Sequence, residues 1–224
     1  MRLYGANAVP IIGDVADPTV GTAIDGALRC YPKGLTILIN NASAGAFMCS
    51  LQPGIEEEVT AHLDVHCIGT FRVGRAAIPY LRRAATALIV NVSSRFGSVS
   101  DAVAGLFADR LLPYAYPIAK AAQNVLTLRM AEELRATGIQ VCAIHSGRMR
   151  TASGSPDAID TPAEAAERLA EWIEAPPQGI HGNFFELDTG RRGWQLVSPP
   201  RHSCSLRSPN RSDQDLSGDP ELLV

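Results

Sequence analysis

Tyr116 and Lys120 stand four residues apart in the segment YAYPIAKAAQNVLTLRMAEEL, which runs from Tyr114 to Leu134. Side chains four residues apart share one face of a helix, one turn from each other. A neighbouring cation favours the phenolate form of a tyrosine, whose pKa is about 10 when unperturbed. The pair could therefore give and take a proton at a carbonyl group. A surface tyrosine beside a solvated lysine is the alternative interpretation.

The apolar pattern around this pair predicts the helix that would position it. Apolar residues recur at nearly helical spacing, at Ile118, Ala121, Ala122, Val125, Leu128 and Leu134. Other apolar runs predict strands over 9–12, 35–39, 87–92, 139–144 and 183–187, and further helices over 17–30, from 53 to about 71, and over 161–174. Strands that are continuously apolar and alternate with helices indicate a parallel sheet covered on both faces. We therefore expect an α/β protein with a Rossmann-like, doubly wound parallel sheet.

Composition narrows the class of protein and its surroundings. The chain has 224 residues, of which 46% are hydrophobic, and a net charge of −3. This charge offers no broad basic surface for nucleic acid, and no apolar run has the length of a membrane helix. The N-terminal stretch lacks the apolar core of a signal peptide. We expect a cytoplasmic protein that binds neither nucleic acid nor a membrane.

The five cysteines argue against both a disulfide framework and a metal site. They are scattered at Cys30, Cys49, Cys67, Cys142 and Cys204, and their number is odd. No C-x-x-C pair is present, so zinc-ligand spacing is missing. Beyond Ser198 the sequence turns to Ser, Pro, Arg and Asp with few apolar anchors. This predicts a domain over 1–197 followed by a disordered polar tail over 198–224.

Polar signals follow the predicted strands in a fixed order. They are Asp14-Val15, then Asn40-Asn41-Ala42, then Ser94, and finally Tyr116-x-x-x-Lys120. Ligands of open α/β sheets bind at the carboxyl ends of the strands, where these signals fall. The ordered set resembles the short-chain dehydrogenase/reductase (SDR) family over residues 8 to about 190. The Ser-Ser-Arg-x-Gly-Ser and His-x-Gly-x-x-x-Thr segments are similar to those of carbonyl reductases of the C-factor or sniffer type.

The resemblance implies an oxidoreductase that moves hydride between NADP or NAD and a carbonyl or alcohol group of a small molecule. Ser94 and Tyr116 would bond the substrate oxygen, and Lys120 would lower the pKa of Tyr116 and bind the nicotinamide ribose. We also expect a homo-oligomer, because apolar surface left exposed on the sheet would invite association. The cofactor-binding positions that it implies are Asp14, Val15, Asn41, Ala42, Tyr116, Lys120, Gly147, Met149 and Thr151.

The sequence departs from the family pattern at two places that bear on function. His66 stands where the family has an asparagine that helps to relay protons to the lysine, so it could serve a relay or only pack in the helix. The glycine-rich phosphate loop has no counterpart here, and we expect the first two strands of the family sheet to be absent. The strand predicted over 9–12 would then pair beside 35–39 or stay unpaired. The alternative function is a catalytically impaired remnant that acts as a binding or regulatory subunit.

Overall fold

The computed structural model describes residues 8–151, 158–190 and 194. These residues form a four-stranded parallel sheet in the order β1 (Ile37–Asn40), β2 (Ala87–Val92), β3 (Ile139–His145) and β4 (Phe184–Glu186). The α/β, Rossmann-like class is therefore confirmed. The absence of the first two family strands stays a prediction, and the predicted tail over 198–224 lies outside the described residues.

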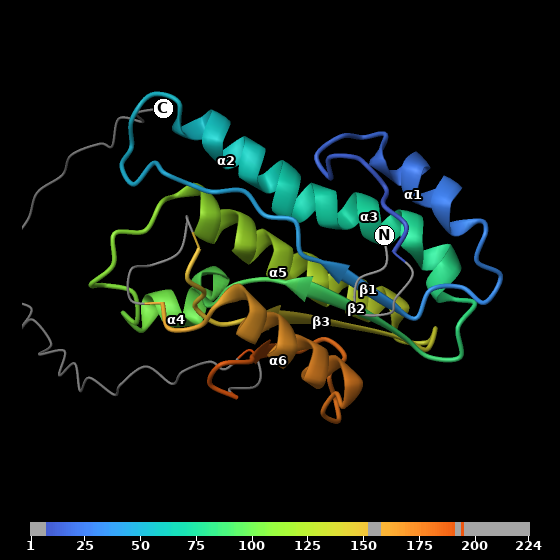
Figure 1. Ribbon diagram of the computed structural model, residues 1–224. Helices are drawn as coiled ribbons and strands as arrows, with labels where there is room; N and C mark the ends of the chain where they lie inside the picture. The colour runs from blue at the N-terminus through green and yellow to red at the C-terminus, as the bar shows by residue number, and fades with distance from the viewer. Residues whose placement is uncertain (1–7, 152–157, 191–193, 195–224) are drawn as a thin grey trace, which may run out of the picture.

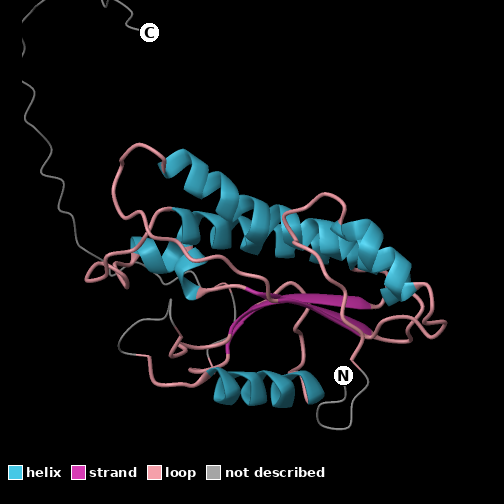
Figure 2. Ribbon diagram, turned by 45° about the horizontal axis from the view of Figure 1, so that its top comes forward, coloured by secondary structure: helices cyan, strands magenta, loops and turns pink. Residues whose placement is uncertain are grey.

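Helices cover both faces of this sheet unequally (Figures 1 and 2). One face carries α1 (Val20–Leu28), α2 (Ile55–Leu63), α3 (Thr70–Leu81) and α5 (Ala115–Leu134), while α6 (Pro162–Glu174) lies over the other. Successive side chains of a strand point to opposite faces, so each face has its own apolar cluster. Ile89 packs with Leu81 and Leu134 on the first face, and Val90 packs with Phe185 on the second.

The single helix predicted from residue 53 to about 71 is divided in the structure. A π-helical turn, η1 (Asp64–Gly69), separates α2 from α3. Such widened turns are rare and often occur at functional sites. The helix predicted over 17–30 is shorter in the structure, where α1 covers only Val20–Leu28. The helix over 161–174 forms as predicted, with a capping box in which Thr161 and Glu164 bond each other's backbone.

The loop after β2 contains two elements that the pattern did not predict, η2 (Arg95–Gly97) and α4 (Val99–Val103). The turn η2 packs directly on α5. A Cβ atom at Gly97 would lie 2.6 Å from the carbonyl carbon of Lys120 and 2.8 Å from the nitrogen of Ala121. Only glycine permits this approach, and it brings the end of β2 against the helix that carries Tyr116.

The strand predicted over 9–12 is wrong. Val9 is 63% exposed and Ile12 is 91% exposed, and no described strand pairs with this segment. An apolar run becomes a strand only when a neighbouring strand takes its backbone hydrogen bonds. The segment is thus the unpaired alternative, and β1 remains at an edge of the described sheet.

Apolar side chains are exposed on two surfaces. Ile37 and Ile39 of the edge strand β1 project from one side while Leu38 packs against the core. On α5, Val125 is 60% exposed and Ile118 is 43% exposed. Exposed apolar patches invite association, but the homo-oligomer stays a prediction. Among the described residues, no helix has the length and apolar character needed to cross a membrane.

Candidate active site

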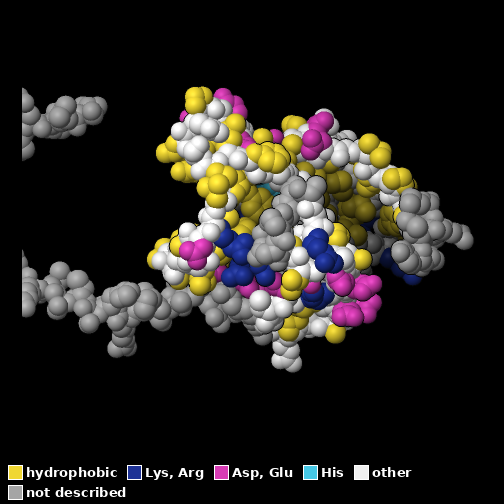
Figure 3. Space-filling view, turned by 60° about the vertical axis from the view of Figure 1, so that its left-hand side comes forward, with side chains coloured by type: hydrophobic (Ala, Val, Ile, Leu, Met, Phe, Trp, Pro, Cys, Tyr) yellow, Lys and Arg dark blue, Asp and Glu magenta, His cyan; other side chains and the backbone are white. Residues whose placement is uncertain are grey.

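The helix α5 and the end of β2 bring the predicted acid–base residues into one cleft. The cleft has a volume of about 720 Å³, and its lining includes Ser94, Tyr116 and Lys120. Tyr116 lies in the first turn of α5, and the Nζ atom of Lys120 is 5.6 Å from the centroid of the Tyr116 ring. Figure 3 shows a hollowed face of the molecule with apolar side chains along it and Lys and Arg side chains below them.

Ser94 and Tyr116 interact directly. Burial raises the pKa of Tyr116, while a hydrogen bond with the Ser94 side chain acts to lower that pKa. Ser94 is itself held at the start of η2, because its Oγ atom accepts a hydrogen bond of 3.2 Å from the Phe96 nitrogen. The phenol is therefore protonated at neutral pH and can act as a proton donor. The sequence led us to expect that Lys120 lowers this pKa, but in the structure burial dominates and the pKa is raised.

Lys120 lies at the base of the cleft and is buried, with only 2% of its surface exposed to solvent. Its Nζ atom donates to the Val92 carbonyl oxygen at 2.7 Å and to Gln123 Oε1 at 3.1 Å. Burial lowers the pKa of Lys120 to about 7. An ammonium has three donors, so these two contacts with described residues leave one for a ligand.

Sequence reasoning missed the polar side of α5 that supports Lys120. Gln123 Nε2 donates to Thr70 Oγ1 at 3.0 Å, and Thr70 Oγ1 donates to the His66 carbonyl oxygen at 2.8 Å. Asn124 Oδ1 accepts from Ser93 Oγ at 2.5 Å. The spacing in the sequence could have indicated these residues, because Gln123 and Asn124 follow Lys120 by three and four residues and so share its helix face.

His66 comes from η1 and lies behind Tyr116. The two rings meet edge to face with centroids 5.6 Å apart. His66 Nε2 accepts a long hydrogen bond of 3.5 Å from the Ala44 nitrogen, while its buried Nδ1 atom has no hydrogen-bond partner among the described residues. Burial lowers the pKa of His66 to about 3, and the charge of Lys120 and the nearby His62 act in the same direction. His66 is therefore neutral at physiological pH, and a relay through it would have to use its neutral forms.

This depressed pKa makes stability depend on pH. Between the folded pKa of His66, about 3, and the unfolded value, about 6.5, the unfolded chain binds more protons, so acid favours unfolding. We expect His66 to reduce the free energy of unfolding by about 2 kcal/mol when pH falls from 7 to 5. Urea denaturation at both pH values, with His66→Asn as the comparison, measures this contribution. An equal loss of stability in the variant would show that other groups cause it.

The predicted cofactor residues divide into two groups. Asn41, Gly147, Met149 and Thr151 line the cleft together with Lys120. Gly147 has φ of +106°, a conformation that favours glycine, and a Cβ atom there would lie 2.9 Å from Asp160 Oδ2. The loop is fastened from α6, because Arg168 donates to the Ser146 carbonyl oxygen at 3.2 Å and to Asp160 at 3.1 Å.

The second group does not reach the cleft. Among the described residues, Asp14, Val15 and Ala42 lie outside its lining. Asp14 is exposed, and its Oδ1 atom accepts from the Ala16 nitrogen at 2.9 Å in a local turn. Asp14 and Val15, which the resemblance assigns to the adenine end, thus lie apart from the cleft lining around Tyr116, and their role in cofactor binding stays a prediction.

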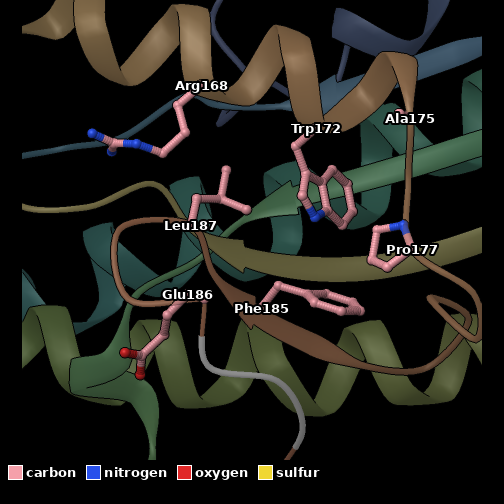
Figure 4. Close-up of a pocket in the computed structure, with 8 residues that line it drawn as sticks. Arg168, Trp172, Ala175, Pro177, Phe185, Glu186 and Leu187 are labelled. Carbon is pink, nitrogen blue, oxygen red and sulfur yellow. The ribbon is translucent and has the colours of Figure 1, made fainter.

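A second hollow of about 380 Å³ lies between α6 and β4 (Figure 4). Trp172 projects from α6 toward Phe185, and their ring centroids are 5.3 Å apart. Both belong to the apolar cluster on this face of the sheet. None of the predicted site residues lines this hollow, so the cleft around Tyr116 is the candidate active site.

Comparison with known sequences identifies the family. The family model described as short chain dehydrogenase matches residues 2–160. C-signal of Myxococcus xanthus is 28% identical over 158 residues, covering 70% of this chain and 92% of that protein. Hydroxysteroid dehydrogenase-like protein 2 of Bos taurus is 30% identical over 195 residues, covering 83% of this chain but only 44% of the relative. The chain belongs to the short chain dehydrogenase family, a family of oxidoreductases.

Solved structures agree with this assignment. The NADPH-bound carbonyl reductase from chicken fatty liver has a TM-score of 0.73 and 25% identity, covering 82% of this chain and 75% of that one. The carbonyl reductase Sniffer of D. melanogaster has the same fold, with a TM-score of 0.67, 22% identity, and coverage of 77% of this chain and 73% of that one. The resemblance to carbonyl reductases within the family is thereby confirmed.

Proposed function

We propose that this chain is an NAD(P)-dependent oxidoreductase that transfers hydride between a nicotinamide cofactor and the carbonyl or alcohol group of a small molecule. The observation that carries the proposal is the convergence of Ser94, Tyr116 and Lys120 in one cleft. Two hydroxyl groups and a buried ammonium are the groups that stabilise negative charge developing on a carbonyl oxygen.

The cleft offers residues that suit a nicotinamide cofactor. Gly147, Met149 and Thr151 would hold the nicotinamide end, and the remaining donor of Lys120 would bond a ribose hydroxyl, with Asn41 beside it. When bound, NADPH or NADH supplies the hydride. Because Asp14 and Val15 lie outside the cleft, we expect the adenosine half to be held weakly.

The protein itself supplies orientation and the proton. In the reductive direction, Ser94 would donate a hydrogen bond to the substrate oxygen, and Tyr116 would give its proton to the same atom. Burial keeps the phenol protonated until then. Lys120 would stabilise the phenolate that remains, and a neutral His66 would stand behind the ring. The catalytic role of His66 stays a prediction.

The lining beside Tyr116 indicates what flanks the reacting carbonyl. Apolar residues of the cleft lining include Ala46, Phe47, Phe96, Leu112, Pro113 and Pro117. Apolar walls with a few converging polar groups are typical of small-molecule sites. We propose that the substrate is a ketone or aldehyde with apolar or aromatic groups next to the carbonyl carbon.

The purified chain should bind NADPH or NADH saturably but weakly, and it should oxidise the bound cofactor when an aromatic ketone or aldehyde is added. Cofactor fluorescence measures the binding, and the loss of absorbance of the reduced nicotinamide measures the reaction. Both cofactors should be titrated into the millimolar range. A folded protein that binds cofactor but reduces no carbonyl compound would instead support the binding or regulatory subunit.

A further inference from the structure

The helix α2 and its continuation η1 carry three polar side chains at four-residue spacing. These are Glu58, His62 and His66. This spacing places them on one face of a helix, one turn apart. His62 and His66 are 2% and 0% exposed, so this face is covered rather than solvated. The loop that follows β1, residues 44–48, lies along this face, and we name it the wall loop.

Each of the three side chains bonds the backbone of the wall loop. Glu58 Oε1 accepts from the Phe47 nitrogen at 2.8 Å, and Glu58 Oε2 accepts from the Met48 nitrogen at 3.1 Å. One turn on, His62 Nε2 lies 2.9 Å from the Gly45 carbonyl oxygen. The last contact is the long one of 3.5 Å from the Ala44 nitrogen to His66 Nε2. The loop therefore runs antiparallel to the helix, with one helix side chain bonded to it at each helical turn.

These contacts fix the tautomers of the two histidines. A carbonyl oxygen can only accept, so His62 Nε2 must carry the proton that it donates to Gly45. His66 Nε2 accepts from a backbone N–H and must carry a lone pair instead. The two rings, whose centroids are 5.4 Å apart, thus hold opposite tautomers. Exchange of the two tautomers would break both contacts.

The loop held in this way is one wall of the candidate active site. Ala44, Gly45, Ala46 and Phe47 line the same cleft as Tyr116. Its far end is tied to α5, because the Tyr114 nitrogen donates to the Met48 carbonyl oxygen at 3.0 Å. A shift of the wall loop would therefore change the width of the cleft beside the proposed proton donor.

We propose that Glu58, His62 and His66 are positioning residues that fasten the wall loop to α2 and so set the shape of the cleft beside Tyr116. The fastening itself stands on the contacts alone, while its effect on substrate rests on the proposed function. The two amide contacts that Glu58 accepts are the shortest ones made by the backbone N–H groups of the wall loop. They involve a charged carboxylate, and such charge-assisted hydrogen bonds are stronger than neutral ones.

Hydrogen exchange of the wall-loop amides tests the fastening directly. Glu58→Ala should speed exchange at Phe47 and Met48 at least about tenfold, because their charged acceptor is lost. Glu57→Ala is the matched control: Glu57 is an exposed neighbour in the same helical turn, so its loss removes the same charge near the helix N-terminus. Glu58→Gln keeps one acceptor oxygen and should give a smaller increase. Equal exchange in Glu58→Ala and Glu57→Ala would overturn the proposal.

Steady-state kinetics test the consequence for the cleft. In Glu58→Ala and His62→Leu, the KM for the carbonyl substrate should rise several-fold while kcat changes less, because the wall moves and the proton donor stays. An unchanged KM, together with faster exchange, would overturn the role in shaping the cleft. If even the unaltered chain reduces no carbonyl compound, the proposed function fails, and the exchange comparison still decides whether the wall loop is fastened as proposed.

Discussion

Tyr116→Phe should lower kcat for carbonyl reduction by about 10²–10⁴-fold, the range that a positioned acid–base group contributes. The substitution removes one hydroxyl group from a ring that otherwise keeps its place. The ring retains its edge-to-face contact with His66, and Ser94 Oγ retains its hydrogen bond from Phe96. The variant loses the hydrogen bond between Tyr116 and Ser94, a modest cost that should leave the fold intact. Single-turnover kinetics at saturating cofactor measure the chemical step.

The control for this prediction is Tyr31→Phe. Tyr31 is 45% exposed, on the segment between α1 and β1 and outside the cleft lining. The change is chemically identical, and kcat should remain that of the unaltered chain. Cofactor affinity should be nearly equal in both variants. Retention of more than about a tenth of kcat in Tyr116→Phe would remove Tyr116 from the role of proton donor.

Much of the fold could be predicted because it depends on local patterns. Continuous apolar runs between helical segments predicted the parallel sheet, and the helix predicted over 161–174 forms as α6. The run at 9–12 failed for a non-local reason. A strand requires a partner for its backbone, and apolar composition alone cannot say whether a partner is present.

The helix α5 shows a second limit of prediction from apolar patterns. Its apolar period correctly predicted a helix, but Ile118, Val125 and Leu128 face outward. The face toward the sheet instead carries Lys120, Gln123, Asn124 and Thr127, which are buried with their hydrogen bonds made within the protein. Buried polar groups are stable only when they are paired, and pairing depends on residues distant in sequence. The ordered motifs therefore predicted Tyr116 and Lys120, while the residues that support them required the three-dimensional arrangement.

Lys120→Met should lower kcat/KM by at least about a hundredfold and also weaken cofactor binding, because one ammonium is proposed to serve both. Methionine retains much of the apolar stem that fills the space under the cleft. It leaves the Val92 carbonyl oxygen and Gln123 Oε1 without their donor. It also removes a charge that is costly to bury. The matched control is Lys33→Met, which alters the only other lysine of the chain, an exposed one.

The pH profile separates the charge of Lys120 from its packing. Burial lowers the pKa of Lys120 to about 7, so the free protein loses the ammonium charge as pH rises through neutrality. Because that charge would stabilise the developing oxyanion, kcat/KM should fall above about pH 7. Burial raises the pKa of Tyr116 above its ordinary value near 10, so the phenol titrates well above the pH at which kcat/KM is expected to fall. This fall in kcat/KM should be absent in Lys120→Met and present in Lys33→Met. If it persists in Lys120→Met, another group titrates there, and the electrostatic role given to Lys120 is wrong.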